Sequence, residues 1–358
     1  MNLATRYLGL NLSSPFIVGA SPFCDDLEMA RRLQDAGASA LVMRSLFAEQ
    51  IPGSRDPFPG AKIRTRQAEE FFDFAVYQLS PDEYLRQLEK LRSTVTIPVI
   101  ASLNGNRPGR WTNLAPQLEA AGASAIELNF YQVVTDPSLP ADAVETDMLE
   151  VMNVVSSSVL IPVSAKLSPF HSSIAQLALA LELAGAAGVV LFNRFYQPDI
   201  DTDDLSVHPV IRLSDPGELL LRLRWLAIVS PLLRGSLSVS GGVHTSVGAV
   251  KSILAGAHAV QLVSALLKHG PSVIATLREG LDTWMRAHGF ADLQEFRGLL
   301  NLQRCADPRA SNARTTFERC RVGHCNAQVC VRASYPVIRS TGRAPSYSVT
   351  LRQETFDS

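Results

Sequence analysis

The 358-residue sequence has no apolar run close to the roughly 20 residues that a membrane-spanning helix needs. Its first residues also lack the basic and then apolar pattern of a secretory signal, so we expect a cytoplasmic protein without a membrane partner. The net charge is only −1, which argues against the basic surface of a nucleic-acid binder. These absences point to a protein whose partner is a small-molecule substrate.

Cysteine is scarce and unevenly placed, and a secreted disulfide framework is therefore not expected. There are five cysteines, an odd number: Cys24 stands alone, far from Cys305, Cys320, Cys325 and Cys330. The last three, with His324, could ligate zinc or an iron–sulfur cluster, but their spacing matches no C-x2-C motif. Free thiols in a loosely ordered or docking tail are the alternative, and we expect no metal site.

A short phrase of small residues recurs four times, at 36–43, 121–128, 184–191 and 255–262, with Ala-Gly-Ala as its common start. Each copy follows a stretch with helical periodicity and precedes an apolar run. Glycine just past a helix adopts a left-handed conformation without steric cost, and the apolar run suits a parallel strand buried on both faces. The repeat therefore predicts successive helix–strand units.

Eight such strands are predicted, at 16–21, 40–45, 99–104, 125–130, 163–168, 189–195, 237–243 and 259–265. Helical patterns alternate with them, for example at 26–36, 81–93, 113–121, 145–156 and 216–233. The count of eight, without a G-x-G-x-x-G after the first strand, favours a closed (β/α)8 TIM barrel over a doubly wound open sheet. We predict one barrel domain over 1–301 and a C-terminal extension over 302–358. The long connections 49–80 and 130–145 would then lie on the catalytic face.

The seventh strand ends in Gly241-Gly242 and the eighth in Val263-Ser264. Paired glycines let the backbone approach an anion, and the loops after strands seven and eight are the usual phosphate site of such barrels. We therefore predict phosphate binding here, with an ordinary tight turn as the alternative reading.

Polar residues end several other strands. Lys166 follows an apolar run, where a buried ammonium must pair or bind a charged group; it would stabilise a reduced, anionic flavin. A surface lysine just past the strand is the alternative. Asn104, Asn129 and Asn193 end strands three, four and six, and amides suit a heterocycle with donors and acceptors, although each could be a turn residue. On strand two, Arg44 could reach the flavin or an acidic substrate, or form a salt bridge within a loop.

Several motifs in the same order resemble the dihydroorotate dehydrogenase family, specifically its soluble class 1 and its dihydroorotate dehydrogenase-like branch. They are the runs 12–16 (LSSPF), 20–22 (ASP), 126–129 (IELN), 165–167 (AKL), 240–243 (SGGV) and the closing stretch 289–298. The resemblance implies pyrimidine biosynthesis and FMN as cofactor, with the phosphate on Gly241, Gly242, Val263 and Ser264. It implies that the isoalloxazine is surrounded by Ala20, Ser21, Ser45, Asn129, Lys166 and Asn193.

The chain departs from the family in the half of the site that holds the substrate. The family places a Cys or Ser base in the loop after strand four, and here Gln132 stands at that position. Glutamine cannot act as a general base, whereas Tyr131 could if its pKa were strongly lowered. The segment between Glu49 and Ser80 contains no asparagine, unlike the family, but has arginines at 55, 64 and 66. Arg44 and Arg194 also replace residues of the family pattern.

The leading hypothesis is an FMN-dependent oxidoreductase acting on CH–CH groups that passes a hydride from a small anionic substrate to flavin N5. In it Lys166, Tyr131 and Arg44 are the catalytic candidates, and Arg44 or Arg194 orients the charge of the substrate. Dihydroorotate itself stays open because of Gln132. The alternatives are a flavin-binding protein without catalysis and a phosphate-binding lyase or isomerase with Lys166 as a Schiff-base nucleophile. A homodimer is one candidate assembly.

Overall fold

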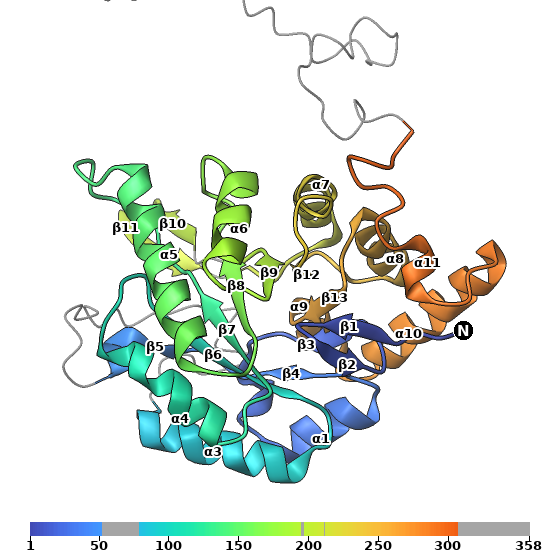
Figure 1. Ribbon diagram of the computed structural model, residues 1–358, viewed down its shortest axis with the longest axis horizontal. Helices are drawn as coiled ribbons and strands as arrows, with labels where there is room; N and C mark the ends of the chain where they lie inside the picture. Colours follow the sequence, from blue (N-terminus) through green and yellow to red (C-terminus); the bar gives the residue numbers. More distant parts are fainter. Residues whose placement is uncertain (52–78, 195–196, 211, 307–358) are drawn as a thin grey trace, which may run out of the picture. The chain divides into compact units, whose positions relative to one another are not determined.

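The computed structural model describes residues 1–51, 79–194, 197–210 and 212–306, all within one compact unit, Met1–Asn312 (Figure 1). Eight parallel strands form a closed ring, in which β13 pairs with β3 and β4 pairs with β6. In ring order they are β3 (Phe16–Val18), β4 (Leu41–Val42), β6 (Val99–Asn104), β7 (Ala125–Asn129), β8 (Val163–Leu167), β9 (Gly188–Leu191), β12 (Ser236–Ser240) and β13 (Ala259–Leu262). The predicted (β/α)8 barrel is confirmed.

Helices surround the ring and shield the outward faces of the strands. The larger ones are α1 (Leu27–Asp35), α3 (Pro81–Thr94), α4 (Ala115–Ala120), α5 (Ala141–Ser158), α6 (Ile174–Leu183), α7 (Leu219–Val229), α8 (Ser246–Ala255) and α10 (Val273–His288). Short elements complete the description: β5 (Leu46–Phe47), η1 (Pro22–Cys24), η2 (Ala48–Gln50), η3 (Arg110–Leu114), η4 (Pro216–Glu218), α9 (Ser264–His269) and α11 (Leu293–Phe296). In the described ranges, none of the helices is both long and apolar enough to cross a bilayer.

Local sequence explains where these helices begin and end. Ser80 caps α3 by accepting a hydrogen bond from the Glu83 N–H, while the Glu83 carboxylate accepts one from the Ser80 N–H at 2.8 Å, a reciprocal capping box. The C-terminal ends of four helices are followed by the glycine of an Ala-Gly-Ala phrase. This glycine has a φ between +94° and +122° at Gly37, Gly122, Gly185 and Gly256. The repeat therefore marks helix ends, as predicted.

Several predicted boundaries were wrong. The strands predicted at 16–21, 237–243 and 259–265 end earlier, at Val18, Ser240 and Leu262, and helix α9 already begins at Ser264. The pattern placed a helix at 145–156, but α5 begins four residues earlier, at Ala141, and the loop after β7 is correspondingly shorter. Pro140 precedes the helix and Asp142 lies in its first turn, where a carboxylate is favourable, and neither residue belongs to the apolar period that we used. The strand predicted at 189–195 ends at Leu191. Most of the long connection 49–80 lies outside the described residues.

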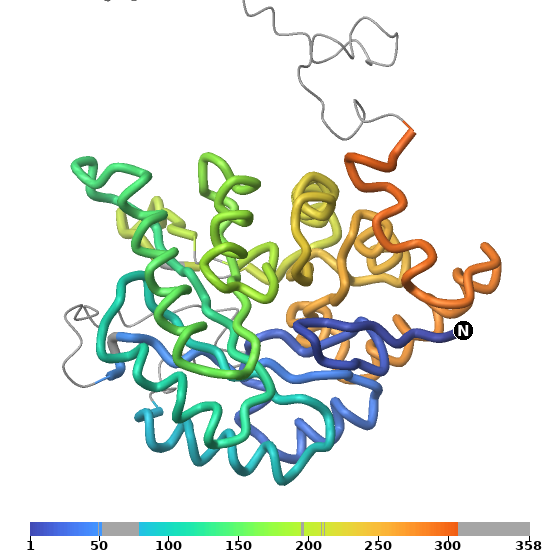
Figure 2. The backbone as a smooth tube through the Cα atoms, viewed as in Figure 1, coloured from blue at the N-terminus to red at the C-terminus, as the bar shows by residue number. Residues whose placement is uncertain are grey.

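Two antiparallel hairpins were not predicted. In the first, β1 (Thr5–Tyr7) pairs with β2 (Leu10–Leu12), and in the second, β10 (Gln197–Asp201) pairs with β11 (Ser206–Val210). The first lies at the N-terminal ends of the barrel strands, because the Leu8 N–H donates to Ser236 Oγ and Thr5 Oγ1 donates to the His258 carbonyl. Figure 2 shows this segment beside the stretch that follows α10, to which the Asn2 N–H is hydrogen-bonded. The hairpin closes this end of the barrel.

Strand side chains alternate between the helices and the barrel interior. In β7, Ile126 and Leu128 pack in the outer core, whereas Ala125 belongs to a separate cluster inside the barrel with Tyr7, Leu8 and other small or branched residues. Glu127 and Asn129 have the same parity as Ala125 and also point inward. The interior is thus apolar near the hairpin and polar toward the C-terminal ends of the strands.

Candidate active site

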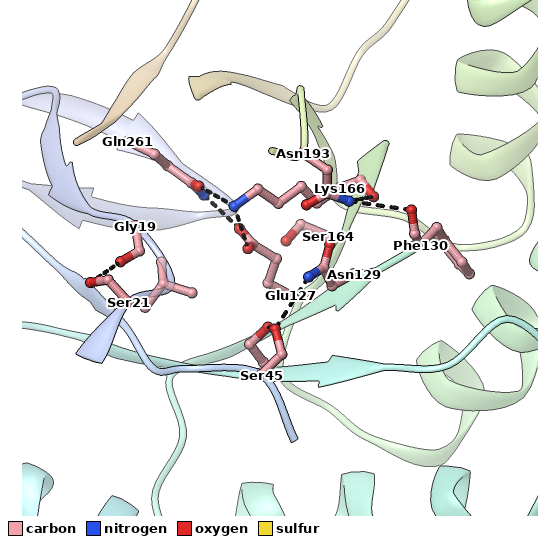
Figure 3. Close-up of polar contacts among 12 residues, drawn as sticks. Gly19, Ser21, Ser45, Glu127, Asn129, Phe130, Ser164, Lys166, Asn193 and Gln261 are labelled. Carbon is pink, nitrogen blue, oxygen red and sulfur yellow. Dashed lines mark hydrogen bonds and ion pairs between the residues drawn. The ribbon is translucent and has the colours of Figure 1, made fainter. Parts of the chain in front are cut away.

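Lys166, Glu127 and Gln261 form a polar network inside the barrel, from β8, β7 and β13 (Figure 3). Lys166 Nζ donates to Gln261 Oε1 at 3.0 Å and lies 3.3 Å from Glu127 Oε1. Gln261 Nε2 donates to Glu127 Oε2 at 2.5 Å. The three residues are at most 5% exposed, so an uncompensated charge here would be costly. The structure therefore buries Lys166 and compensates its charge, and the surface reading of this lysine was wrong.

Sequence reasoning singled out Lys166 but missed both of its partners. Glu127 and Gln261 are polar residues within two of the four repeated phrases, in runs that are otherwise apolar. Glu127 lies two residues before Asn129, which places both on the same face of a strand. The signal that could have revealed Glu127 is a charged residue on the same face of the predicted strand as Asn129.

The amides of β6 and β7 leave hydrogen-bonding capacity at the barrel mouth. The register places Asn104 opposite Asn129, whose Nδ2 donates to Ser45 Oγ at 3.3 Å. Ser45 Oγ in turn lies 2.7 Å from Ser102 Oγ. Among the described residues, Asn129 Oδ1 and Asn104 Nδ2 are buried without a hydrogen-bond partner. Buried polar groups are normally paired, and an acceptor and a donor on neighbouring strands fit a heterocycle that offers both complementary groups.

Asn193, predicted to contact the cofactor, also organises the backbone. Its Nδ2 donates to the Phe130 carbonyl at 3.2 Å and to the Lys166 carbonyl at 3.3 Å. The Phe130 N–H donates to the same Lys166 carbonyl at 3.1 Å. This buried amide therefore holds the ends of β7 and β8 in place beside the Lys166 network.

The turn after β3 lies beside the end of β13, as the prediction for Ala20, Ser21 and Val263 requires. The Gly19 N–H donates to the Leu262 carbonyl at 3.0 Å, and a Cβ built on Gly19 would lie only 2.8 Å from Val263 Cγ2. Ser21 is buried, and its hydroxyl donates to the Gly19 carbonyl at 2.9 Å. A glycine is needed here because the two loops approach so closely.

The predicted phosphate turn requires both of its glycines. Gly241 and Gly242 have φ values of +84° and +82°, a region that favours glycine. A Cβ on Gly242 would lie 2.7 Å from the backbone nitrogen of Leu219, and one on Gly241 would lie 2.8 Å from Arg222 Nη2. A tight turn with this close backbone packing is compatible with anion binding.

Ser214 joins the two predicted phosphate loops, and it was not predicted as a site residue. It is buried, its N–H donates to Ser264 Oγ at 2.9 Å, and its Oγ accepts from the Gly242 N–H at 3.1 Å. Lys268 Nζ donates to the Ser214 carbonyl at 2.9 Å, and His244 Nε2 lies 3.3 Å from Ser214 Oγ. Burial and then the nearby Lys268 lower the pKa of His244. Lys268 therefore adds positive charge where a phosphate is predicted.

Both arginines that we considered for substrate binding form ion pairs. Arg44 Nη2 lies 3.0 Å from Asp25 Oδ2, in agreement with its reading as a salt-bridge partner. Burial raises the pKa of Asp25 to about 6, and Arg44 partly opposes this rise. Arg194 pairs with Glu218, which also contacts Arg222 at 3.5 Å. Anion binding by either arginine stays a prediction.

A cavity of about 330 Å³ lies at the catalytic face, and residues that directly follow β7 and β8 line it. Gln132, at the family's base position, lines it together with Phe130, whereas Tyr131 is half-buried and its carbonyl accepts a hydrogen bond from Asn106 Nδ2 at 3.4 Å. The arginines at 55, 64 and 66 lie outside the described residues, as do His324 and the cysteines at 320, 325 and 330. Cys305 is half-buried, and its Sγ lies 3.8 Å from the Leu302 carbonyl. The described residues contain no cluster of three potential metal ligands.

Comparison with known proteins gives several relatives, although no protein-family model matches the chain. A protein of Aeropyrum pernix named "Putative dihydroorotate dehydrogenase A (fumarate)" is 33% identical over 226 residues, which cover 60% of this chain and 72% of that protein. The "Dihydroorotate dehydrogenase B (NAD(+)), catalytic subunit" of Thermoplasma volcanium is 27% identical over 83% of this chain and 98% of its own length. The "NAD-dependent dihydropyrimidine dehydrogenase subunit PreA" of Escherichia coli is 24% identical over 84% of this chain and 77% of its own length.

Proposed function

Because this chain belongs to the dihydroorotate dehydrogenase family, we propose that it is an FMN-dependent oxidoreductase that removes a hydride from a small substrate. Its relatives support the broader class of flavin-type oxidoreductases. The observation that carries the finer proposal is a pair of buried amide atoms, Asn129 Oδ1 and Asn104 Nδ2, that have no hydrogen-bond partner among the described residues; Asn129 is the register partner of Lys166. A flavin ring presents carbonyl oxygens and an N–H, which complement these groups.

The residues of this chain would divide the work as follows. Asn104, Asn129 and Lys166 would hold the polar edge of the ring, and Gly241-Gly242, with Lys268 near it, would hold the phosphate. The bound FMN would supply the hydride acceptor. Lys166, which lies 3.3 Å from Glu127, would stabilise negative charge that develops on the ring, because such an interaction is strong in a buried site.

Two observations bear on the alternatives. Gln132 lines the cavity at the position of the family's base, which favours a second candidate, a flavin-binding protein without dihydroorotate oxidation. A Schiff-base lyase or isomerase is less compatible with the geometry. Its nucleophile must be an uncharged amine, whereas Lys166 is paired with a buried carboxylate.

The visible absorption spectrum of the purified protein tests the cofactor. We expect a flavin spectrum, and acid release followed by chromatography should identify FMN. A colourless protein that also fails to bind added FMN would contradict the proposal, and borohydride trapping of a substrate at Lys166 would support the lyase instead. Anaerobic bleaching of the bound flavin then separates the two flavin candidates, with dihydroorotate as the first substrate and other small CH–CH donors after it.

A further inference from the structure

A cavity opens at the C-terminal ends of β7 and β8, the strands that carry Glu127 and Lys166. It lies between the loop after β7, the first two turns of α5 and the loop after β8. Phe130 connects the cavity to the ends of β7 and β8: it lines the cavity, its N–H donates to the Lys166 carbonyl, and its carbonyl accepts from Asn193. The volume of about 330 Å³ is at the lower end of ordinary ligand sites and suits one ring or one branched chain.

The lining of this cavity is mostly apolar and has no positive charge in the described part of the chain. Apolar side chains come from all three segments, for example Val133, Val144, Met148 and Phe170. None of the described lining residues is a lysine or arginine, and the only carboxylate is Glu145. Among the described lining residues, a carboxylate group of a ligand would therefore meet no cation, and burying an unpaired charge is costly.

The lining contains hydrogen-bond acceptors that have no partner in the described part of the chain. Asn106 Oδ1 is buried without a partner among the described residues. His171 forms no hydrogen bond or ion pair within the described ranges, and burial lowers the pKa of its imidazole, which is therefore uncharged near neutral pH. Burial and then Asp142 raise the pKa of Glu145, the other titratable group in the lining. A ligand group that donates a hydrogen bond would satisfy an acceptor that is otherwise unpaired.

We propose that this cavity is a substrate-specificity subsite that takes an uncharged, mainly apolar group carrying a hydrogen-bond donor, with His171 as the acceptor. The inference rests on the proposed function, because it assigns the subsite to the substrate that would meet the flavin. It refines the expected substrate class, because the part of the molecule beside Gln132 would be apolar and uncharged.

Three one-ring probes test the chemistry by ligand-observed NMR titration of the full chain. Phenol is an uncharged ring with a donor, anisole lacks the donor, and benzoate is anionic. We expect phenol to bind about three- to tenfold more tightly than anisole, as one hydrogen bond would give, and benzoate to bind most weakly. Benzoate binding as tight as phenol would overturn the proposal. His171→Phe should remove the preference for phenol over anisole, and a preference that survives this change would refute the role of His171.

Variants that fill the cavity with a large side chain test whether phenol binds there. Ala141 is exposed and Val134 is 40% exposed, and both line the cavity from different segments, so Ala141→Trp and Val134→Trp should fold normally. Each should weaken phenol binding at least about tenfold. Val154→Trp is the matched control, because Val154 is an exposed residue of α5 outside the lining. It should bind phenol like the parent protein.

The flavin spectrum recorded on the same samples separates this proposal from the proposed function. If the protein binds flavin but both filling variants bind phenol as tightly as the parent protein, the subsite proposal alone would be overturned. A protein that binds no flavin would overturn the proposed function, and with it the assignment of the cavity to a substrate, whatever the phenol titration shows. A flavin-bound protein that loses phenol in both variants supports the subsite.

Discussion

Breaking the buried network tests how the charge of Lys166 is compensated. Glu127→Leu would leave the ammonium in a site where the side chain of Lys166 is 7% exposed and that of Glu127 1% exposed. Removing one partner of a buried ion pair costs about 3–5 kcal/mol, because the remaining charge stays buried without compensation. We expect the free energy of unfolding of Glu127→Leu to fall by that amount.

Removing the second charge should restore much of this loss. In the double variant Glu127→Leu/Lys166→Met, no charge remains to be compensated, but the Gln261 amide loses both partners. A buried unpaired amide costs about 1–3 kcal/mol, so the double variant should lie between the single variant and the parent. Adding Gln261→Leu should bring the stability close to that of the parent, since apolar replacements of similar volume are often neutral.

Urea unfolding followed by circular dichroism measures this series, with and without added FMN because a bound ligand adds stability. Ser238→Ala is the control, because it removes one neutral hydroxyl from the same barrel interior. This hydroxyl donates to the Ala259 carbonyl at 3.2 Å, and its loss should lower the free energy of unfolding by only about 1 kcal/mol. A double variant no more stable than Glu127→Leu would refute the reasoning, because the loss would then come from packing and not from the uncompensated charge.

Three further predictions concern the phosphate turn and two histidines. Gly242→Ala should abolish FMN binding in a fluorescence titration and lower the free energy of unfolding by at least about 1–3 kcal/mol, because φ is +82° and the added Cβ would clash with the backbone. Gly270→Ala is the control, since Gly270 has a similar φ of +73° but no atom within 4 Å of the added Cβ, and this variant should keep FMN binding. Burial lowers the pKa of His258 to about 4, so the unfolded chain binds a proton at this residue more readily than the folded protein. The free energy of unfolding should therefore fall by about 3 kcal/mol as the pH drops from 6.5 to about 4. A His258→Gln variant that kept this pH dependence would contradict the prediction. The affinity for phenol should stay constant between pH 6.5 and about pH 8, where phenol keeps its proton, and should fall below the lowered pKa of His171. The same pH dependence should appear in a Glu145→Gln variant, and an NMR titration that shows no loss of affinity down to about pH 4 would speak against imidazole as the acceptor.

The barrel could be predicted because its signals are local and repeated. Four Ala-Gly-Ala phrases mark helix ends, and the apolar runs mark strands buried on both faces. The β1–β2 hairpin escaped prediction because strands of three residues carry too little alternation to be recognised. Helix α5 was placed too late because its first turn is defined by a preceding proline and an acidic residue, and not by apolar periodicity.

Site residues at the ends of strands could be predicted from the sequence. Residues that reach the site from segments far away along the chain could not. Lys166 and Asn129 follow apolar runs, so their place at the mouth could be read from the sequence. Ser214 could not, because it comes from an irregular segment and contacts Gly242 and Ser264 across 28 and 50 residues of sequence. The pairing of Arg44 with Asp25 likewise depends on how two loops meet in space.

The β1–β2 hairpin has a consequence for the order of assembly during synthesis. It precedes its partners in the chain, since the Leu8–Ser236 and Thr5–His258 hydrogen bonds span 228 and 253 residues. Contacts of such long range form late in folding, so we expect Tyr7, Leu8 and neighbouring apolar side chains to stay exposed until β12 and β13 have left the ribosome. A segment that is translated early is therefore docked last, and the barrel is sealed at its base only after the ring has closed.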